Sequence, residues 1–95
     1  MIALGPTARP ALRRRARLRW DAARGTHVLL YPEGLLVLTP EAAEVLGLCD
    51  GARTVDDLVA ALAARYPDAP EATLRTDVTD LLARLAARGF VGAEG

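Results

Sequence analysis

The sequence is poor in the residue types from which most catalytic and metal sites are built. Its 95 residues include one histidine, one cysteine and no lysine. His27 and Cys49 stand in no motif that would make either of them a base, a nucleophile or a metal ligand. A closed zinc site needs several cysteine and histidine ligands, and the glycines form no phosphate-binding loop. We therefore interpret both residues as structural and expect no enzymatic activity, no cofactor and no metal.

Membrane and secretion signals are also missing. No apolar run approaches the roughly 20 residues that span a bilayer, and the N-terminus lacks the apolar stretch and cleavage site of a secretory signal. A single cysteine cannot form an internal disulfide, which agrees with a reducing compartment. These absences predict a cytoplasmic protein that does not interact with membranes.

What the sequence does contain is enough apolar material for one core. Hydrophobic residues make up 52% of the chain and only four residues are aromatic, so the core must be built from Leu, Val and Ala. A chain of this length has room for a single domain. Residues 1–11 include two prolines and show no period, which predicts a flexible N-terminal arm, and residues 12–95 form the single domain.

Charge is distributed unevenly although the chain is neutral overall. Residues 1–27 carry seven arginines against one acid, and residues 28–95 carry five arginines against eleven acids. The basic segment 9–21 raises the alternative of a winged-helix nucleic-acid-binding regulator. A recognition helix should be basic, whereas the later helical segments are rich in acids. An acidic peptide or protein partner suits the basic segment equally well.

Alternating residues predict the first strand. Ala16, Leu18 and Trp20 alternate with arginines and Asp21 at the period of two that is typical of a strand with one solvated face. Gly25 then marks a turn. We expect this strand to be the first of three antiparallel strands.

Two apolar runs, residues 28–31 and 35–38, flank Pro32-Glu33-Gly34 and predict a hairpin. The proline suits the first central position of a type I turn, and the glycine can close a three-residue loop. Both runs are apolar at every position, so both faces of the sheet need cover. The second run carries no charge or proline that would discourage pairing, and we interpret it as an edge that can accept another strand. The alternative is that the third helix and the arm, or a homodimer, bury it.

Three helices follow the hairpin. Thr39 caps the first, which Asp50-Gly51 ends. Thr54 caps the second, which Pro67 ends, and Asp68 with Glu71 forms a candidate capping box for the third. The apolar stripe of the second helix comprises Val55, Leu58, Val59, Leu62 and Tyr66. The stripe of the third comprises Leu74, Val78, Leu81, Leu82 and Leu85.

The aspartates of these helices have electrostatic rather than catalytic explanations. Asp56 and Asp57 suit the positive first turn of the second helix. Asp77, Asp80 and Arg84 suit a solvated face of the third, with an ion pair between the last two. The order β-β-β-α-α-α predicts an α+β fold.

Three segments together resemble one known family. They are LLYPEGLLVLTPEAAEVL at 29–46, LCDGARTVDDLV at 48–59 and DVTDLLARLAARG at 77–89. In combination they resemble PqqD, the peptide chaperone of pyrroloquinoline quinone (PQQ) biosynthesis and the founding leader-peptide recognition element. Thr39 departs from the pattern, because relatives often carry Asn there, but either residue can cap a helix.

The resemblance implies a winged-helix-like fold without catalytic residues. It implies that the chain binds the precursor peptide PqqA and presents it to PqqE, a radical S-adenosylmethionine (SAM) enzyme. In related recognition elements the leader adds as a strand beside the third strand, in a groove completed by the third helix. The expected peptide-binding residues are Leu35, Leu36, Val37, Leu38, Leu74, Val78, Leu81 and Leu85.

Two expectations remain from the basic segment and the open edge. Arg13, Arg14 and Arg15 form a candidate docking site for an acidic patch on the enzyme partner. An edge that can receive a peptide can equally receive another copy of the chain, so the protein is expected to be a monomer or a homodimer.

Overall fold

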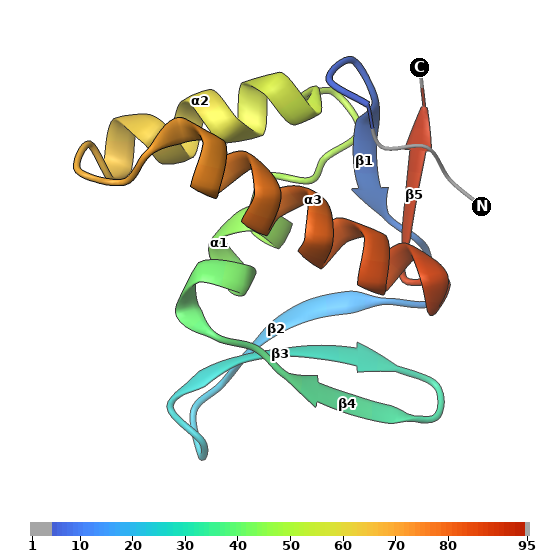
Figure 1. Cartoon of the computed structure of the whole chain (residues 1–95). Coiled ribbons are helices and arrows are strands. Elements are labelled where there is room, and N and C mark those ends of the chain that lie inside the picture. The colour runs from blue at the N-terminus through green and yellow to red at the C-terminus, as the bar shows by residue number, and fades with distance from the viewer. Residues whose placement is uncertain (1–4, 95) are drawn as a thin grey trace.

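The computed structural model describes residues 5–94 and is a mixed α+β structure (Figure 1). A three-stranded antiparallel sheet has the order β2-β3-β4, and a separate two-stranded ribbon pairs β1 with β5. The three helices lie on one side of the larger sheet, and the ribbon lies beside the helices near the two ends of the chain (Figure 1). The strands are β1 (Arg9–Leu12), β2 (Arg17–Asp21), β3 (Thr26–Tyr31), β4 (Gly34–Val37) and β5 (Val91–Glu94). The helices are α1 (Pro40–Gly47), α2 (Val55–Arg65) and α3 (Glu71–Ala87).

The predicted three-stranded sheet and its helices are confirmed, with one change in the hairpin. Tyr31 pairs with Gly34, which leaves a two-residue loop of Pro32 and Glu33 instead of the three residues expected. The register continues through Leu29 with Leu36 and Val28 with Val37.

Hydroxyl caps begin the first two helices as predicted, but the third begins differently. Thr39 accepts the amide of Ala42 at 3.1 Å. The capping box belongs to α2, where Thr54 accepts the amide of Asp57 at 3.1 Å and the carboxylate accepts the amide of Thr54 at 2.9 Å. The predicted box of Asp68 and Glu71 is wrong because Pro70, which has no side-chain acceptor, occupies the N-cap of α3. At the far end of α3, Gly89 takes the positive φ of 80° that ends a helix, as expected.

The segment predicted as a flexible arm is ordered from Gly5 onwards, and residues 1–4 lie outside the described residues. Ala8 and Pro10 are buried. Val55 N–H donates to the carbonyl of Ala8 at 2.9 Å, and Asp56 N–H donates to that of Pro6 at 3.1 Å. These bonds satisfy the start of α2, whose first amides have no partner within the helix. The need for those acceptors explains why a segment without periodicity is fixed in place.

A single aliphatic core lies between the helices and the inner face of the sheet. Its most deeply buried large side chains come from every layer, which ties sheet, helices and ribbon together. They are Leu29, Leu46, Leu58, Leu82 and Val91. Within the described residues no helix is long and apolar enough to cross a bilayer.

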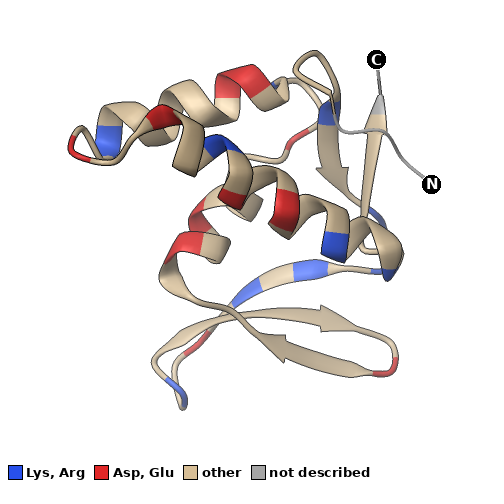
Figure 2. Cartoon of the chain, viewed as in Figure 1, with Lys and Arg blue, Asp and Glu red and all other residues tan. Residues whose placement is uncertain are grey.

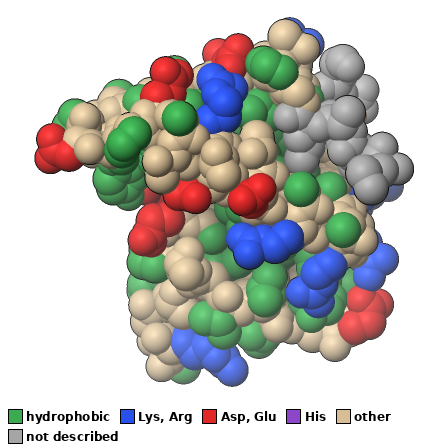
Figure 3. All heavy atoms as spheres, in the orientation of Figure 1, with side chains coloured by type: hydrophobic (Ala, Val, Ile, Leu, Met, Phe, Trp, Pro, Cys, Tyr) green, Lys and Arg blue, Asp and Glu red, His purple; other side chains and the backbone are tan. Residues whose placement is uncertain are grey.

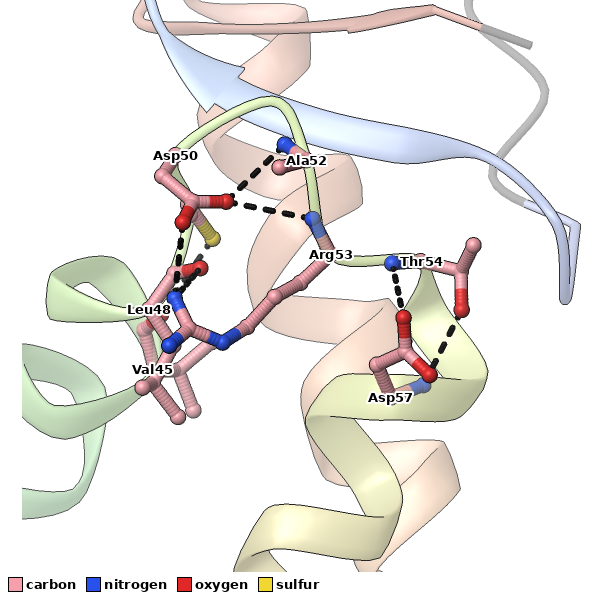
Figure 4. A network of polar contacts seen from close by, with 8 residues as sticks. Val45, Leu48, Asp50, Ala52, Arg53, Thr54 and Asp57 are labelled. Carbon is pink, nitrogen blue, oxygen red and sulfur yellow. Dashed lines mark hydrogen bonds and ion pairs between the residues drawn. The ribbon is translucent and has the colours of Figure 1, made fainter.

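The loop between α1 and α2 is held by carboxylates (Figure 4). Asp50 accepts the amides of Ala52 and Arg53 at 2.9 and 3.1 Å and pairs with the Arg53 guanidinium at 2.8 Å. These hydrogen bonds lower the pKa of Asp50, and the amide of Thr54 lowers the pKa of Asp57. Both carboxylates are therefore structural, and the electrostatic explanation of Asp57 is the one that fits.

Candidate functional site

One edge of the larger sheet is open. β4 pairs with β3 on one side only. The amide of Leu38 donates to the carbonyl of His27 at 3.1 Å. Because antiparallel pairs alternate between hydrogen-bonded and non-bonded, Leu36 also faces β3, while Leu35 and Val37 point their N–H and C=O groups away from it. Those two residues offer an incoming strand a set of unpaired backbone groups.

The side chains of β4 divide between two faces. Leu38 is buried and Leu36 packs against the core. Leu35 and Val37 are 38% and 54% exposed, and they lie on the opposite face of the sheet. An added strand would thus meet apolar side chains on both faces.

A groove runs beside this edge, between β4 and α1 on one side and α3 on the other. It consists of two adjoining hollows of about 340 and 580 Å³, which share Thr39, Ala42, Leu81 and Arg84. Hydrophobic side chains are visible in the hollow below α3, with acidic and basic side chains on either side (Figure 3). The combined volume is of the size that binding clefts usually have.

The structure brings most of the predicted peptide-binding residues together around this groove. The smaller hollow is lined by Leu36, Val37 and Leu38 with Leu81 and Leu85. The larger hollow adds Leu74 and Val78. Leu35 is the exception, because it lines neither hollow.

The predicted peptide-binding residues of α3 do not contribute equally to the groove. Val78 and Leu85 are 2% and 3% exposed, so they belong mainly to the core. Leu81 and Leu74 are half-buried and are packed against the core from its rim. Leu81 lines both hollows and is therefore the central apolar side chain of the groove.

Several groove residues were not anticipated from the sequence. Ala42 lines both hollows, where its small side chain leaves space. Arg84 of α3 and Arg88, the residue that follows the helix, line the groove. Within residues 5–94, Arg84 forms no ion pair with Asp80, contrary to the expected i, i+4 pair. Nothing in the period of α3 distinguished this face from an ordinary solvated one.

Arg88 is held at the hairpin end of the groove. Its guanidinium donates to the Tyr31 hydroxyl at 3.3 Å and lies 4.9 Å from the ring centroid of Phe90 and 5.6 Å from that of Tyr31. Cation–π contacts of this kind fix the position of the guanidinium. The C-terminal turn of α3 is thereby attached to β3.

Tyr66 lines the opposite end of the larger hollow. Its hydroxyl donates to Glu44 at 2.7 Å, and this hydrogen bond to a carboxylate raises the pKa of Tyr66. The ring, predicted as part of the buried stripe of α2, is 38% exposed. Tyr66 therefore belongs to the groove rather than to the core.

The predicted docking arginines lie between β1 and β2 and are exposed. Arg13 uses its amide to donate to the carbonyl of Phe90 at 2.9 Å. Arg15 pairs with Glu33 of the hairpin loop at 2.7 Å, where both side chains are about half exposed or more. Arg15 is thus near the hairpin loop, and none of the three arginines lines the groove.

The two residues that could suggest chemistry have structural positions. Cys49 is buried, donates to the carbonyl of Val45 at 3.2 Å, and has its pKa raised to about 12 by that burial. A thiol with such a pKa is protonated at neutral pH and is not a nucleophile. His27 packs edge-on against Trp20, with ring centroids 5.0 Å apart. Among the described residues no group of three His, Cys, Asp or Glu side chains could hold a metal ion.

Comparisons with solved structures find the same fold. The solution structure of the PqqD truncation of Methylobacterium extorquens PqqCD is 36% identical, with a TM-score of 0.78 over 97% of this chain and 95% of that one. That protein is described as a functional and stand-alone recognition element for ribosomally synthesised, post-translationally modified peptides. PqqD from Xanthomonas campestris is also 36% identical, with a TM-score of 0.54 over 82% of this chain and 86% of that one.

Comparisons of sequence agree with those of structure. A protein of Rhodopseudomonas palustris (strain TIE-1) named "PqqA binding protein" is 44% identical over 95% of this chain and 87% of its own length. Another of that name, from Stutzerimonas stutzeri (strain A1501), is 53% identical over 63% of this chain and 65% of its own. The family model described as coenzyme PQQ synthesis protein D matches residues 26–91. The chain therefore belongs to the PqqD family.

Proposed function

We propose that the protein is a non-catalytic peptide chaperone of PQQ biosynthesis that binds a PqqA-type precursor along β4 and presents it to the radical SAM enzyme PqqE. The observation that carries the proposal is the open edge of β4 beside an apolar groove. Relatives named for PqqA binding support the identity of the peptide. The likeness to a structurally characterised recognition element supports the mode of action.

The peptide binds by β-augmentation. Leu35 and Val37 exchange backbone hydrogen bonds with the incoming strand, and alternate peptide side chains enter the groove against Leu81. Each backbone hydrogen bond contributes about 0.5 to 1.5 kcal/mol net. A few such bonds with one or two buried apolar anchors give a dissociation constant of about a micromolar or lower.

The peptide-bearing edge and the enzyme-docking surface are different parts of the molecule in this proposal. Arg13, Arg14 and Arg15 are exposed and line neither hollow of the groove, so they are available to an acidic patch of PqqE while β4 holds the peptide. Charge reversal of all three arginines should remove the ternary complex and leave peptide binding intact. Size-exclusion chromatography of the three-component mixture checks this, and an unchanged ternary complex would exclude the arginines as the docking site.

A hairpin followed by a three-helix unit is a winged-helix-like arrangement, and we infer the same general architecture here. No observation favours the nucleic-acid-binding alternative. The helices that would face DNA carry acidic residues on their exposed sides (Figure 2), whereas phosphate binding requires a basic surface.

Calorimetric titration with a synthetic PqqA precursor peptide tests the proposal, with random duplex DNA as the control at about 0.15 M salt. We expect saturable one-to-one binding of the peptide and no heat from DNA. DNA binding without peptide binding would overturn the proposal in favour of a regulator. No binding of either, combined with a dimeric elution volume, would show that the β4 edge is occupied by a second copy.

A further inference from the structure

The groove beside β4 is charged differently at its two ends. The larger hollow, next to α1, is bordered by Glu41, Asp77 and Asp80. The smaller hollow, next to β4, is bordered by Arg88 and by Arg84, which stands where the two hollows meet. In the second half of α3, acidic segments are followed by basic ones towards the C-terminus (Figure 2), while Arg75, nearer the N-terminus, pairs with Asp56 of α2.

Four of these five charges, all except Arg88, are not used to hold the fold together. All five side chains belong to exposed residues. The ion pairs among residues 5–94 involve other groups, such as Arg75 with Asp56 at 2.8 Å across α2 and α3. Within the described part of the chain, Arg88 is the one member of the five with side-chain partners, the neutral Tyr31 hydroxyl and the rings of Tyr31 and Phe90. The three carboxylates and the Arg84 guanidinium are therefore unpaired within residues 5–94. The Arg88 guanidinium is placed by its contacts with Tyr31 and Phe90 and still has N–H donors for a ligand in the groove.

The separation of the two charged ends matches a short extended segment. An α-helix rises about 1.5 Å per residue, so the middle of the Asp77 and Asp80 pair lies about 11 Å from the middle of the Arg84 and Arg88 pair. A strand rises about 3.3 Å per residue. About three residues of extended peptide thus cover the distance between the ends.

The direction of the added strand follows from that of β4. β4 begins at Gly34, opposite Tyr31 and hence at the Arg88 end, and it leads through Thr39 into α1 and Glu41. The existing pairs of this sheet are antiparallel, and antiparallel pairing is the more stable kind. An antiparallel ligand places its N-terminal side beside the carboxylates and its C-terminal side beside the arginines.

We propose that the groove selects an extended segment that carries a basic residue before its paired stretch and an acidic residue after it, separated by about three residues. The inference rests on the proposed peptide binding and adds the charge pattern and direction of the ligand. Polarity of this kind sets the register and excludes the reversed orientation, because a reversed segment would place like charges together.

Peptides with exchanged flanking charges test the charge pattern. The precursor stretch that the protein protects from hydrogen exchange is synthesised in three forms: lysine before and glutamate after it, the reverse, and glutamine on both sides. We expect the lysine-first form to bind about tenfold more tightly than the glutamate-first form at about 0.05 M salt, and the difference to shrink at about 0.5 M salt, because exposed charges are screened.

Charge exchange on the protein provides the reciprocal test. The triple variant Asp77→Lys, Asp80→Lys, Arg84→Glu should invert the order of the three peptides. Asp68→Asn and Arg14→Gln change single exposed charges outside the groove and should leave the order unchanged. Circular dichroism melting confirms that each variant folds.

The outcomes separate this inference from the function on which it rests. Equal affinities for the three peptides, or an order that the triple variant does not invert, would overturn the charge pattern and leave β-augmentation in place. Tighter binding of the glutamate-first form would overturn the direction. Failure of the unmodified precursor to bind would overturn both proposals.

Discussion

The two edges of the three-stranded sheet are protected to very different degrees. β2 carries Arg17, Arg19 and Asp21 along its five residues, and charged side chains discourage the approach of a foreign strand. β4 is the sequence Gly-Leu-Leu-Val, with neither charge nor proline, and α3 stands beside it as the wall of a groove. The comparison indicates that an open edge here is a controlled feature: the chain blocks one edge and leaves the other available.

A substitution that disrupts the open edge of β4 should have the largest effect on peptide affinity. The Val37 amide points away from β3, so Val37→Pro removes a donor that the peptide needs and the fold does not use. We expect peptide affinity to fall about ten- to a hundredfold, because a carbonyl of the bound peptide is then left without a donor. Calorimetry on protein whose circular dichroism spectrum is native measures this.

Leu36→Pro is the matched control for that substitution. The Leu36 amide belongs to the hydrogen-bonded pair with Leu29, so proline there removes a bond within the sheet and should unfold the hairpin. If Val37→Pro folds and binds the peptide as tightly as the original chain, the β4 edge is not the binding site.

Truncating a side chain of the groove wall should have the next largest effect on peptide affinity. Leu81→Ala removes the side chain that lines both hollows, and we expect the dissociation constant for the peptide to rise about tenfold. The adjacent Leu82 is fully buried, so Leu82→Ala should instead lower the free energy of unfolding by about 2 to 5 kcal/mol. Denaturant titration and calorimetry of both variants separate the two roles, and unchanged peptide affinity in Leu81→Ala would remove α3 from the site.

Removing the protection of the other edge should have a smaller effect. The double variant Arg17→Thr, Arg19→Thr retains strand-forming residues but makes β2 neutral except for Asp21. We expect a several-fold increase in light scattering at high protein concentration, because the edge then resembles β4. Peptide affinity should stay within about twofold. A variant that remains as monodisperse as the original chain would show that the arginines do not protect this edge.

The smallest expected effect lies away from both edges, in the loop between α1 and α2. The pKa values of Asp50 and Asp57 are lowered from 3.8 in the folded chain, so protons bind more readily to the unfolded state. Their contribution to stability is present above pH 4 and is lost as the pH falls through the folded-state pKa values. Between pH 5 and pH 3, the melting temperature of the double variant Asp50→Asn, Asp57→Asn should fall by about a few degrees less than that of the original chain. Equal slopes would contradict this assignment.

Local periodicity was sufficient to predict the parts of the fold that carry it. The apolar runs of the hairpin and the stripe of α3 extend over enough residues for their periods of 2 and 3.6 to be recognised. β1 and β5 were missed because each has four residues, one with Pro10 and the other with Gly92, and neither alternates. Their pairing depends on contact between the two ends of the chain, which no local pattern reports.

The site was predictable to a similar extent. The uncharged run Leu35 to Leu38 indicated the open edge, and the packing of α3 showed which of its leucines face the groove. Arg84 and Arg88 could not be assigned to the groove from the sequence, because a solvated helix face and a groove wall have the same composition. Only the placement of α1 against α3 distinguishes the two.

The antiparallel ribbon of β1 and β5 has a consequence for tethering. Pairing of Arg9 with Glu94 brings the two ends of the described chain to one corner, on the side of the helices away from β4 (Figure 1). A sensor surface, or a second protein fused at either end, would therefore hold the molecule by that corner and leave the β4 edge pointing outward. Attachment through the ribbon, at either end of the chain, would therefore leave the groove accessible to a peptide.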